Sequence, residues 1–254
     1  MELLEYITLV LLPYLVIPLY VILILQRLWF WMKLYNPALK LIPGPRTTRA
    51  LWARQYRPTI DLFPSGNRKP GVRFWRDFKG FVLFAGLFGR DKVLWFGSWT
   101  FHVAMLVLLI VHLKWLVPLV AWFGEDALRR MAQVAGWATI GSGMLLFVRR
   151  LLVARVRQIT SKADYTSEIV LNLTVLTGLW VGYDRPDAHE VYSFLKGLVS
   201  FNPIVPDFGL SLVLHLLSFQ LLLVLMPFSH LLHSGGIFVS RRFLASPNSF
   251  SGDV

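Results

Sequence analysis

The chain has 254 residues, of which 56% are hydrophobic, and its mean hydropathy is +0.57. This composition is typical of a polytopic membrane protein and argues against a soluble globular domain. The sequence contains no cysteine, which excludes disulfides, iron–sulfur clusters and cysteine-linked haem within this chain. We assign its net charge of +12 to membrane-flanking loops rather than to nucleic-acid binding.

Five apolar stretches predict transmembrane helices, and together they predict an all-α bundle that forms one domain over residues 1–254. The first stretch carries Pro13 and Pro18, which we expect to kink it. The fourth is the weakest, because Glu168 and Asn172 lie in its first turns. In chain order the five stretches span about residues 7–31, 93–121, 131–148, 166–182 and 208–232.

The connections between these stretches differ in length and charge. Residues 36–92 form a long basic loop. Within it, 72–89 mix bases with aromatic residues and predict either a helix in the headgroup plane or a docking surface for a soluble subunit. Residues 124–130 predict a short turn, and residues 183–207 a loop with three prolines.

The distribution of basic residues predicts the orientation in the membrane. With five spans, 21 of the 26 lysines and arginines fall on one side, in residues 27–92, 149–162 and 241–242. By the positive-inside rule, the N-terminus is expected outside and the C-terminus in the cytoplasm. We therefore expect a multi-pass protein of the cytoplasmic (inner) membrane.

Histidines are the most informative residues of the apolar stretches. The second stretch carries His102 and His112, and the last carries His215, His230 and His233. Ionisable side chains are costly inside a membrane and mark functional sites. Because neutral imidazole is a common ligand of metals and of haem iron, we predict two b-type haems held between these two helices.

The antiparallel course of the two helices predicts which histidines meet. His112 pairs with His215 near the outer face, and His102 pairs with a histidine at the inner end of the last stretch. Along a helix, His215 and His233 are about 27 Å apart, and His215 and His230 about 22 Å, whereas His102 and His112 are about 15 Å apart. Spacing alone therefore leaves both His230 and His233 open as the inner ligand.

Three motifs resemble the gamma subunit of respiratory nitrate reductases and the related membrane cytochromes of sulfite-reduction and heterodisulfide-reductase complexes. They are the run 101–112, the run 225–233 and the basic segment 149–164. The resemblance covers about residues 99–233. It implies that His102 and His233 hold an inner haem, and that His112 and His215 hold an outer one.

The resemblance also implies a function, that of the quinol-oxidising electron-transfer subunit of a multi-subunit oxidoreductase. Quinol from the membrane pool, which we expect to be menaquinol, would be oxidised near the outer haem. The electrons would pass to a cytoplasmic iron–sulfur subunit, and through it to a catalytic subunit that reduces nitrate, sulfite or a disulfide. The competing hypothesis is a cofactor-free membrane anchor or transporter subunit whose histidines relay protons.

Further residues are candidates for contact with the cofactor or with quinol. Basic residues near the outer haem could orient a quinone oxygen or simply reach the membrane interface. Arginines at the inner end could bind haem propionates or lipid headgroups, and small residues could admit a flat cofactor or a neighbouring backbone. The quinol candidates are Lys114, Arg129 and Arg130, and the haem-contact candidates are Gly136, Gly143, Arg149, Arg150, Arg155, Arg157 and His230.

Overall fold

The computed structural model describes residues 3–33, 80, 82–115, 119–205 and 208–229, and every regular element in these ranges is a helix. The predicted all-α class is therefore confirmed for this part of the chain. In chain order the elements are α1 (Leu3–Tyr6), the π-helix η1 (Ile7–Leu11), α2 (Leu12–Lys33), α6 (Ala85–Phe88), α7 (Lys92–His112), η2 (Leu113–Trp115), α8 (Leu119–Phe123), α9 (Glu125–Leu152), α10 (Ala154–Ile159), α11 (Lys162–Asp184), α12 (Ala188–Val199), α13 (Leu210–Leu225) and η3 (Met226–Phe228).

Four helices in the described ranges are long and apolar enough to cross a membrane. They are Ile7–Trp29, Lys92–Trp115, Glu125–Leu152 and Leu210–Phe228. These correspond to four of the five predicted spans. α11 has a similar length of 23 residues but is more polar, so the fifth span and the orientation of the termini stay predictions.

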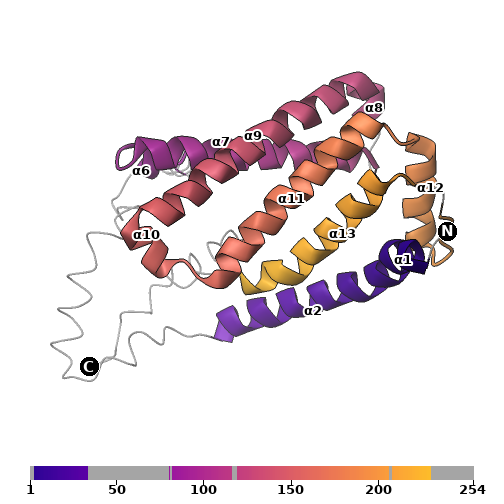
Figure 1. Ribbon diagram of the computed structural model, residues 1–254, viewed down its shortest axis with the longest axis horizontal. Coiled ribbons are helices and arrows are strands. Elements are labelled where there is room, and N and C mark those ends of the chain that lie inside the picture. The colour runs from indigo at the N-terminus through magenta and orange to yellow at the C-terminus, as the bar shows by residue number, and fades with distance from the viewer. Residues whose placement is uncertain (1–2, 34–79, 81, 116–118, 206–207, 230–254) are drawn as a thin grey trace, which may run out of the picture.

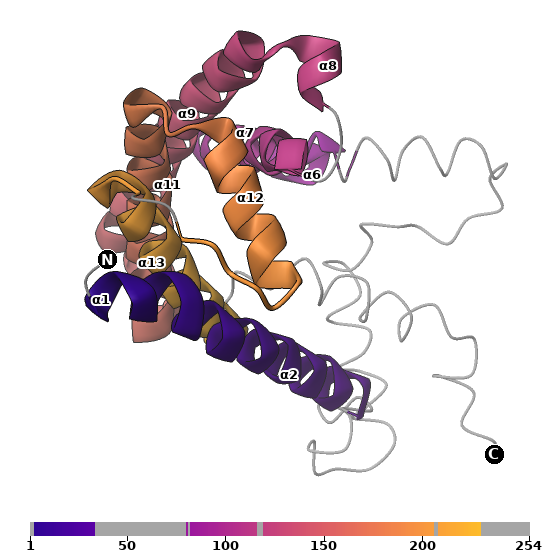
Figure 2. The ribbon, with the colours of Figure 1, turned by 90° about the vertical axis from the view of Figure 1, so that its right-hand side faces the viewer.

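The long helices pack side by side in the order α7, α9, α11, α13 and α2 (Figure 1). α12 lies across one end of this row (Figure 2), where a cluster of buried apolar side chains joins it to η1 and α13. A second cluster, formed by Val170, Leu171 and Leu222 with Phe101 and Met105, joins α7 to α11 and α13. The two helices that carry the candidate histidines are thus fixed relative to each other.

The start of α9 corrects the predicted turn at 124–130. Only Gly124 leaves the helical region, with a φ of 75°, and the helix begins directly after it at Glu125. Glu125 and Asp126 occupy the first turn, where carboxylates interact favourably with the positive end of the helix dipole. As a result, Arg129 and Arg130 are helical residues rather than loop residues.

The predicted loop 183–207 is also wrong in part, because it contains α12. The side chain of Asp187 accepts hydrogen bonds from the backbone N–H groups of His189 and Glu190 and so caps this helix. Val191 and Phe194 lie three residues apart and are both buried against the bundle. α12 is therefore an amphipathic helix with one face on the ends of the spans.

A proline in the first span creates a tie to the last one. In η1 the N–H of Leu12 donates to the carbonyl of Ile7, five residues back. The next π-type donor would be residue 13, but a proline has no N–H, so the carbonyl of Thr8 lacks that bond. Gln220 of α13 donates to this carbonyl at 3.0 Å instead.

The ends of two predicted spans fall partly outside the described residues. α7 ends at His112 and is followed by η2 to Trp115, and residues 116–118 of the predicted span to residue 121 lie outside the described part of the chain. α13 ends at Leu225, just before Pro227, which cannot donate to the preceding turn. Residues 230–254 and most of the basic loop 36–92 lie outside the described residues, and within 72–89 the described helical residues are 80, 82 and those of α6.

Glycines bring α9 close to α11. A Cβ on Gly136 would lie 2.7 Å from Cδ2 of Leu179, and one on Gly143 would lie 2.9 Å from Oδ1 of Asn172. Such small residues are the usual means by which membrane helices approach each other closely. Gly141, on the same helix, is exposed and would place its Cβ in open space.

We expect Gly136→Val to lower the stability of the bundle by about 1–3 kcal/mol relative to Gly141→Val, because only the first variant overpacks the contact with α11. Both variants lose similar helix propensity, so the difference isolates the packing effect. Thermal unfolding of the purified variants in detergent measures it. Equal stabilities would contradict the assigned contact.

Candidate functional site

The rings of His112 and His215 lie close together. One stands at the end of α7 and the other on α13, and their centroids are 6.2 Å apart with an angle of 31° between the ring planes. His112 is exposed, and His215 is partly buried. The structure therefore brings together the two histidines that we expected to form the outer pair.

Hydrogen bonds define the protonation of both rings. Nδ1 of His112 lies 2.7 Å from the carbonyl oxygen of Leu108, and Nδ1 of His215 lies 3.0 Å from that of Thr174. A carbonyl oxygen only accepts, so each Nδ1 carries the proton and donates it. In a neutral ring this leaves the lone pair on Nε2, which is the atom that binds a metal.

His112 and His215 would suit a haem iron, because each would offer it the lone pair of Nε2. A metal–nitrogen bond to histidine is about 2 Å long and the ring centroid lies about 1 Å further, so a centroid separation of about 6 Å would allow both rings to bind one metal. The observed 6.2 Å agrees with this value. The donation of Nδ1–H to a backbone carbonyl is also the usual support of a metal-ligating histidine.

Residues of α11 surround the ring of His215 and position it. A Cβ on Gly178 would lie only 2.9 Å from Cε1 of the His215 ring, so the absence of a side chain there makes room for the imidazole. The hydroxyl of Thr177 is 3.3 Å from Nδ1 of the same ring and 3.1 Å from the hydroxyl of Ser218. Together with the carbonyl of Thr174, these groups fix where the ring lies.

His102 has a similar local support in the middle of α7. Its Nδ1 lies 2.6 Å from the carbonyl oxygen of Ser98, so the proton is again on Nδ1. The ring packs edge-on against Phe84 and Phe101, at centroid distances of 5.1 and 5.6 Å.

Both candidate inner ligands, His230 and His233, lie outside the described residues, as does the predicted contact of His230 with a haem. No group of three or more histidine or acidic residues suited to a metal occurs in the ranges that the structure covers. A bis-histidine site needs only two protein ligands.

The arginines at the end of α9 are paired with carboxylates. Arg149 binds Asp91 at 2.7 Å, and Arg150 binds Glu168, which is buried. Asp91 also caps α7 by accepting from the N–H of Leu94, and the bonds from Leu94 and Arg149 lower the pKa of Asp91. These pairs tie α9 to α7 and α11, and any contact with a propionate stays a prediction.

The other haem-contact candidates show no shared site in the described part of the chain. Arg155 and Arg157 lie on α10, and Arg157 donates to the backbone carbonyl of Leu151 at 3.2 Å. Gly136 and Gly143 face side chains of α11. The placement of both glycines is explained by helix packing, and their role toward a cofactor stays a prediction.

Two of the three quinol candidates are engaged in ion pairs. Lys114 binds Glu125 at 2.8 Å and lies 4.7 Å from the ring centre of Trp115. Arg129 lies 3.4 Å from Asp126, one turn away on α9. The Lys114–Glu125 pair joins the segment after α7 to the start of α9, whereas the Arg129–Asp126 pair lies within α9.

Arg130 differs from the other two, because it lines an open groove between α7 and α9. The groove has a volume of about 460 Å³, and apart from Arg130, Thr100 and the indole N–H of Trp99 its lining is apolar. That N–H is buried and has no hydrogen-bond partner in the part of the chain that the structure describes. No ion pair of Arg130 occurs within the same ranges.

Several residues of the site were not identified from the sequence. Thr174, Thr177 and Gly178 lie on one face of a stretch that was recognised only as a weak span. Their spacing of three and four residues within an apolar helix is the signal that could have found them. Asp91 and Glu168 are the partners of the arginines, and only tertiary structure reveals these pairs.

Comparison with known proteins places these observations in context. A family model described as nitrate reductase gamma subunit matches residues 73–249. A relative from Archaeoglobus fulgidus, named Hdr-like menaquinol oxidoreductase cytochrome b-like subunit, is 28% identical over 166 residues, which cover 58% of this chain and 49% of that protein. A protein of the same name from Archaeoglobus profundus is 25% identical over 263 aligned positions, covering 90% of this chain and 76% of that protein. The chain thus spans about half the length of the first relative.

We expect Gly178→Ala to weaken haem binding by about 10-fold or more, because its Cβ would displace the His215 ring from its supporting hydrogen bonds. Gly182→Ala is the matched control, since a Cβ there meets no atom within 4 Å. The absorbance ratio of haem to protein after purification measures the effect. Identical haem content in the two variants would show that α11 does not position the ligand.

Proposed function

The chain belongs to the nitrate reductase gamma subunit family, and from this membership we propose that it is the di-haem cytochrome b subunit of a respiratory membrane complex. It takes electrons from a quinol, menaquinol in the first instance, and delivers them to a cytoplasmic iron–sulfur subunit. That partner serves a catalytic subunit that reduces nitrate, sulfite or a disulfide. The names of the two Archaeoglobus relatives support the choice of menaquinol.

The observation that carries this proposal is the His112–His215 pair. Two imidazoles from different helices have centroids 6.2 Å apart, and both have Nδ1 bonded to a backbone carbonyl. His112 and His215 would hold a haem iron from both sides, and the haem would supply one-electron transfer there. The role of the chain is therefore to hold and orient the haem and to shield it from substrates.

The second haem is assigned to His102 and His233. His102 has the same Nδ1 support as His112, and the family resemblance favours His233 over His230. Beside His102 on α7, Phe101 and Met105 pack on the apolar cluster of Val170, Leu171 and Leu222.

We further assign α11 as the fifth span. Its polar residues Ser167, Glu168, Thr174 and Thr177 are buried in the bundle, while Ile169, Leu173 and Leu176 are exposed. A polar face directed at protein and an apolar face directed outward is the pattern expected of a helix in lipid. Five spans with the basic loops in the cytoplasm place the N-terminus outside, and the iron–sulfur partner then docks on the basic loop 36–92.

Arg130 is the best candidate for contact with quinol. It stands at one end of an apolar groove that suits an isoprenoid chain, whereas Lys114 and Arg129 are paired with carboxylates. A guanidinium stays protonated, so Arg130 can donate hydrogen bonds to a quinone oxygen but does not act as a base. Its role is to position the ligand.

Removal of single histidines tests the haem assignment. We expect His112→Ala and His102→Ala each to lower the haem content from two to one per chain, because each breaks one pair. His189→Ala is the control, since His189 is exposed in the first turn of α12. Pyridine haemochrome analysis of the purified proteins gives the ratio. Absence of haem from the unaltered protein would favour the cofactor-free anchor instead.

Measurements of quinol binding test whether the groove at Arg130 holds the quinol. We expect Arg130→Ala to raise the Kd of a menaquinol analogue by about 10-fold or more, the loss typical of a hydrogen bond from a charged group. Arg129→Ala should leave the Kd within a factor of two or so of the original, since Arg129 already pairs with Asp126. Fluorescence quenching titrations with unchanged haem content provide the measurement. A larger effect at Arg129 than at Arg130 would refute the assignment.

A further inference from the structure

The turn that ends α12 has an unusual residue in its left-handed position. The N–H of Asn202 donates to the carbonyl of Gly197 at 2.9 Å, and the N–H of Phe201 donates to that of Leu198 at 3.3 Å. This pair of bonds is the Schellman motif, which needs a left-handed residue after the helix. Phe201 fills that position with a φ of 57°. Glycine is the usual residue there, because side chains clash with the backbone in this conformation.

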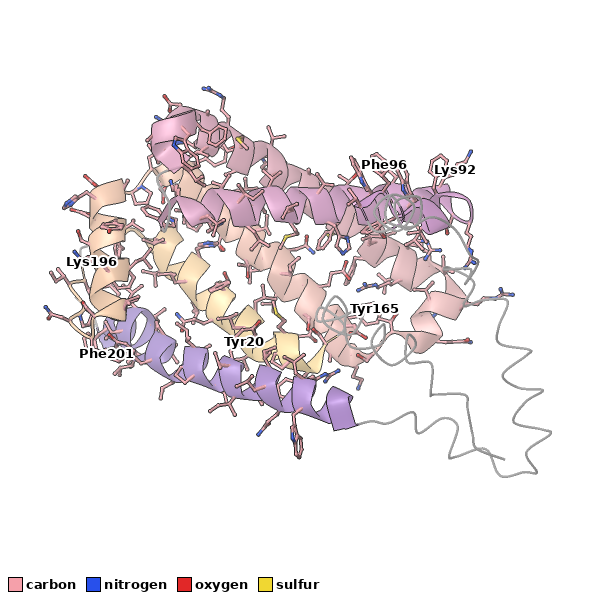
Figure 3. All side chains as sticks on the ribbon, turned by 180° about the vertical axis from the view of Figure 1, so that it is seen from behind. Tyr20, Lys92, Phe96, Tyr165, Lys196 and Phe201 are labelled. Carbon is pink, nitrogen blue, oxygen red and sulfur yellow. The ribbon has the colours of Figure 1, made fainter. Side chains whose placement is uncertain are left out.

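The residues at this turn expose large apolar side chains. Val199 and Phe201 are each 82% exposed, and Ile204 is 63% exposed. Figure 3 shows Phe201 at one extremity of the molecule, with Lys196 of α12 nearby. Large apolar groups projecting together from a turn are unfavourable in water and indicate a non-aqueous contact.

The surroundings of Phe201 show what this contact is. Its ring stacks on that of Tyr14 in α2, with centroids 5.3 Å apart and planes inclined by 9°. The hydroxyl of Tyr14 donates to the carbonyl of Leu198 and fixes the turn against the span. Along the same face of α2, Val21 and Leu25 are exposed at 48% and 59%. The apolar tip therefore continues the outward-facing surface of a candidate membrane span.

We propose that the tip formed by residues 199–204 is inserted into the headgroup–acyl boundary of the bilayer, with Phe201 as its anchor. α12 is then an interfacial helix, whose buried face packs on the span ends and whose tip binds lipid. An aromatic ring at this depth is typical of membrane interfaces. The lipid contact offsets the strain of a phenylalanine in a left-handed position. This proposal depends on the membrane location and is independent of the haem sites.

Spin labelling tests the proposal in the full-length protein, reconstituted in phospholipid vesicles. The chain has no cysteine, so Phe201→Cys gives a single nitroxide site. Collision with oxygen reports lipid, and collision with a water-soluble nickel chelate reports water. Leu15→Cys, at an exposed site of α2, is the lipid control, and His189→Cys, in the first turn of α12, is the water control.

We expect the label at residue 201 to give an oxygen-to-nickel ratio close to that at residue 15 and well above that at residue 189. A ratio like that at residue 189 would place the tip in water and overturn the proposal. Low collision rates with both reagents would also overturn it, because they would show that a second copy or another protein covers the tip.

A second variant separates anchoring from folding. Phe201→Gly removes the ring but keeps a residue suited to the left-handed turn. We attach the nitroxide at residue 199 through Val199→Cys and compare the protein with and without Phe201→Gly. We expect Phe201→Gly to make this label more accessible to the nickel chelate, while the haem spectrum stays the same. An unchanged label at residue 199 would show that Phe201 does not anchor the helix.

Discussion

The hydrogen bond from His215 to the carbonyl of Thr174 is the interaction on which the rest of this structure depends. It joins α13 to α11, places the proton on Nδ1 and leaves the lone pair on Nε2, in a ring whose centroid lies 6.2 Å from that of His112. His112 needs no such help from another helix, because it bonds to Leu108 in its own preceding turn. The geometry of the pair is thus set mainly from the side of α11.

The polar residues of α11 contact His215 and Arg150. Its buried face carries a threonine hydroxyl beside His215, a glycine that admits the ring, and near its start a glutamate paired with Arg150. Each of these groups would be costly in lipid and is satisfied only within the bundle. The helix that least resembles a membrane span by composition is therefore the one that organises the others.

The sequence was sufficient to predict features that depend on a local residue pattern. It was insufficient to predict features that depend on which helix faces contact each other. Long apolar runs predicted the four helices that are long and apolar enough to cross a membrane, and the positions of His112 and His215 on antiparallel helices predicted their encounter. The start of α9 was misjudged because Glu125, Asp126, Arg129 and Arg130 look like a polar turn, although acidic residues favour a helix start. α12 was missed because nearby prolines outweighed the cap at Asp187. The pairing of Arg149 with Asp91 joins residues distant in the chain, and no local pattern encodes it.

The position of the two ligand helices in the chain has a consequence for biosynthesis. Among the described helices, α7 is made early and α13 late, with α9, α11 and α12 between them. Until α13 has joined the bundle, His112 lacks the opposing ring of His215, so a haem bound as we propose would be held from one side only. Loading of this site would therefore follow synthesis of α13, and a newly made chain would pass through a state in which the earlier helices are assembled around an incomplete pair.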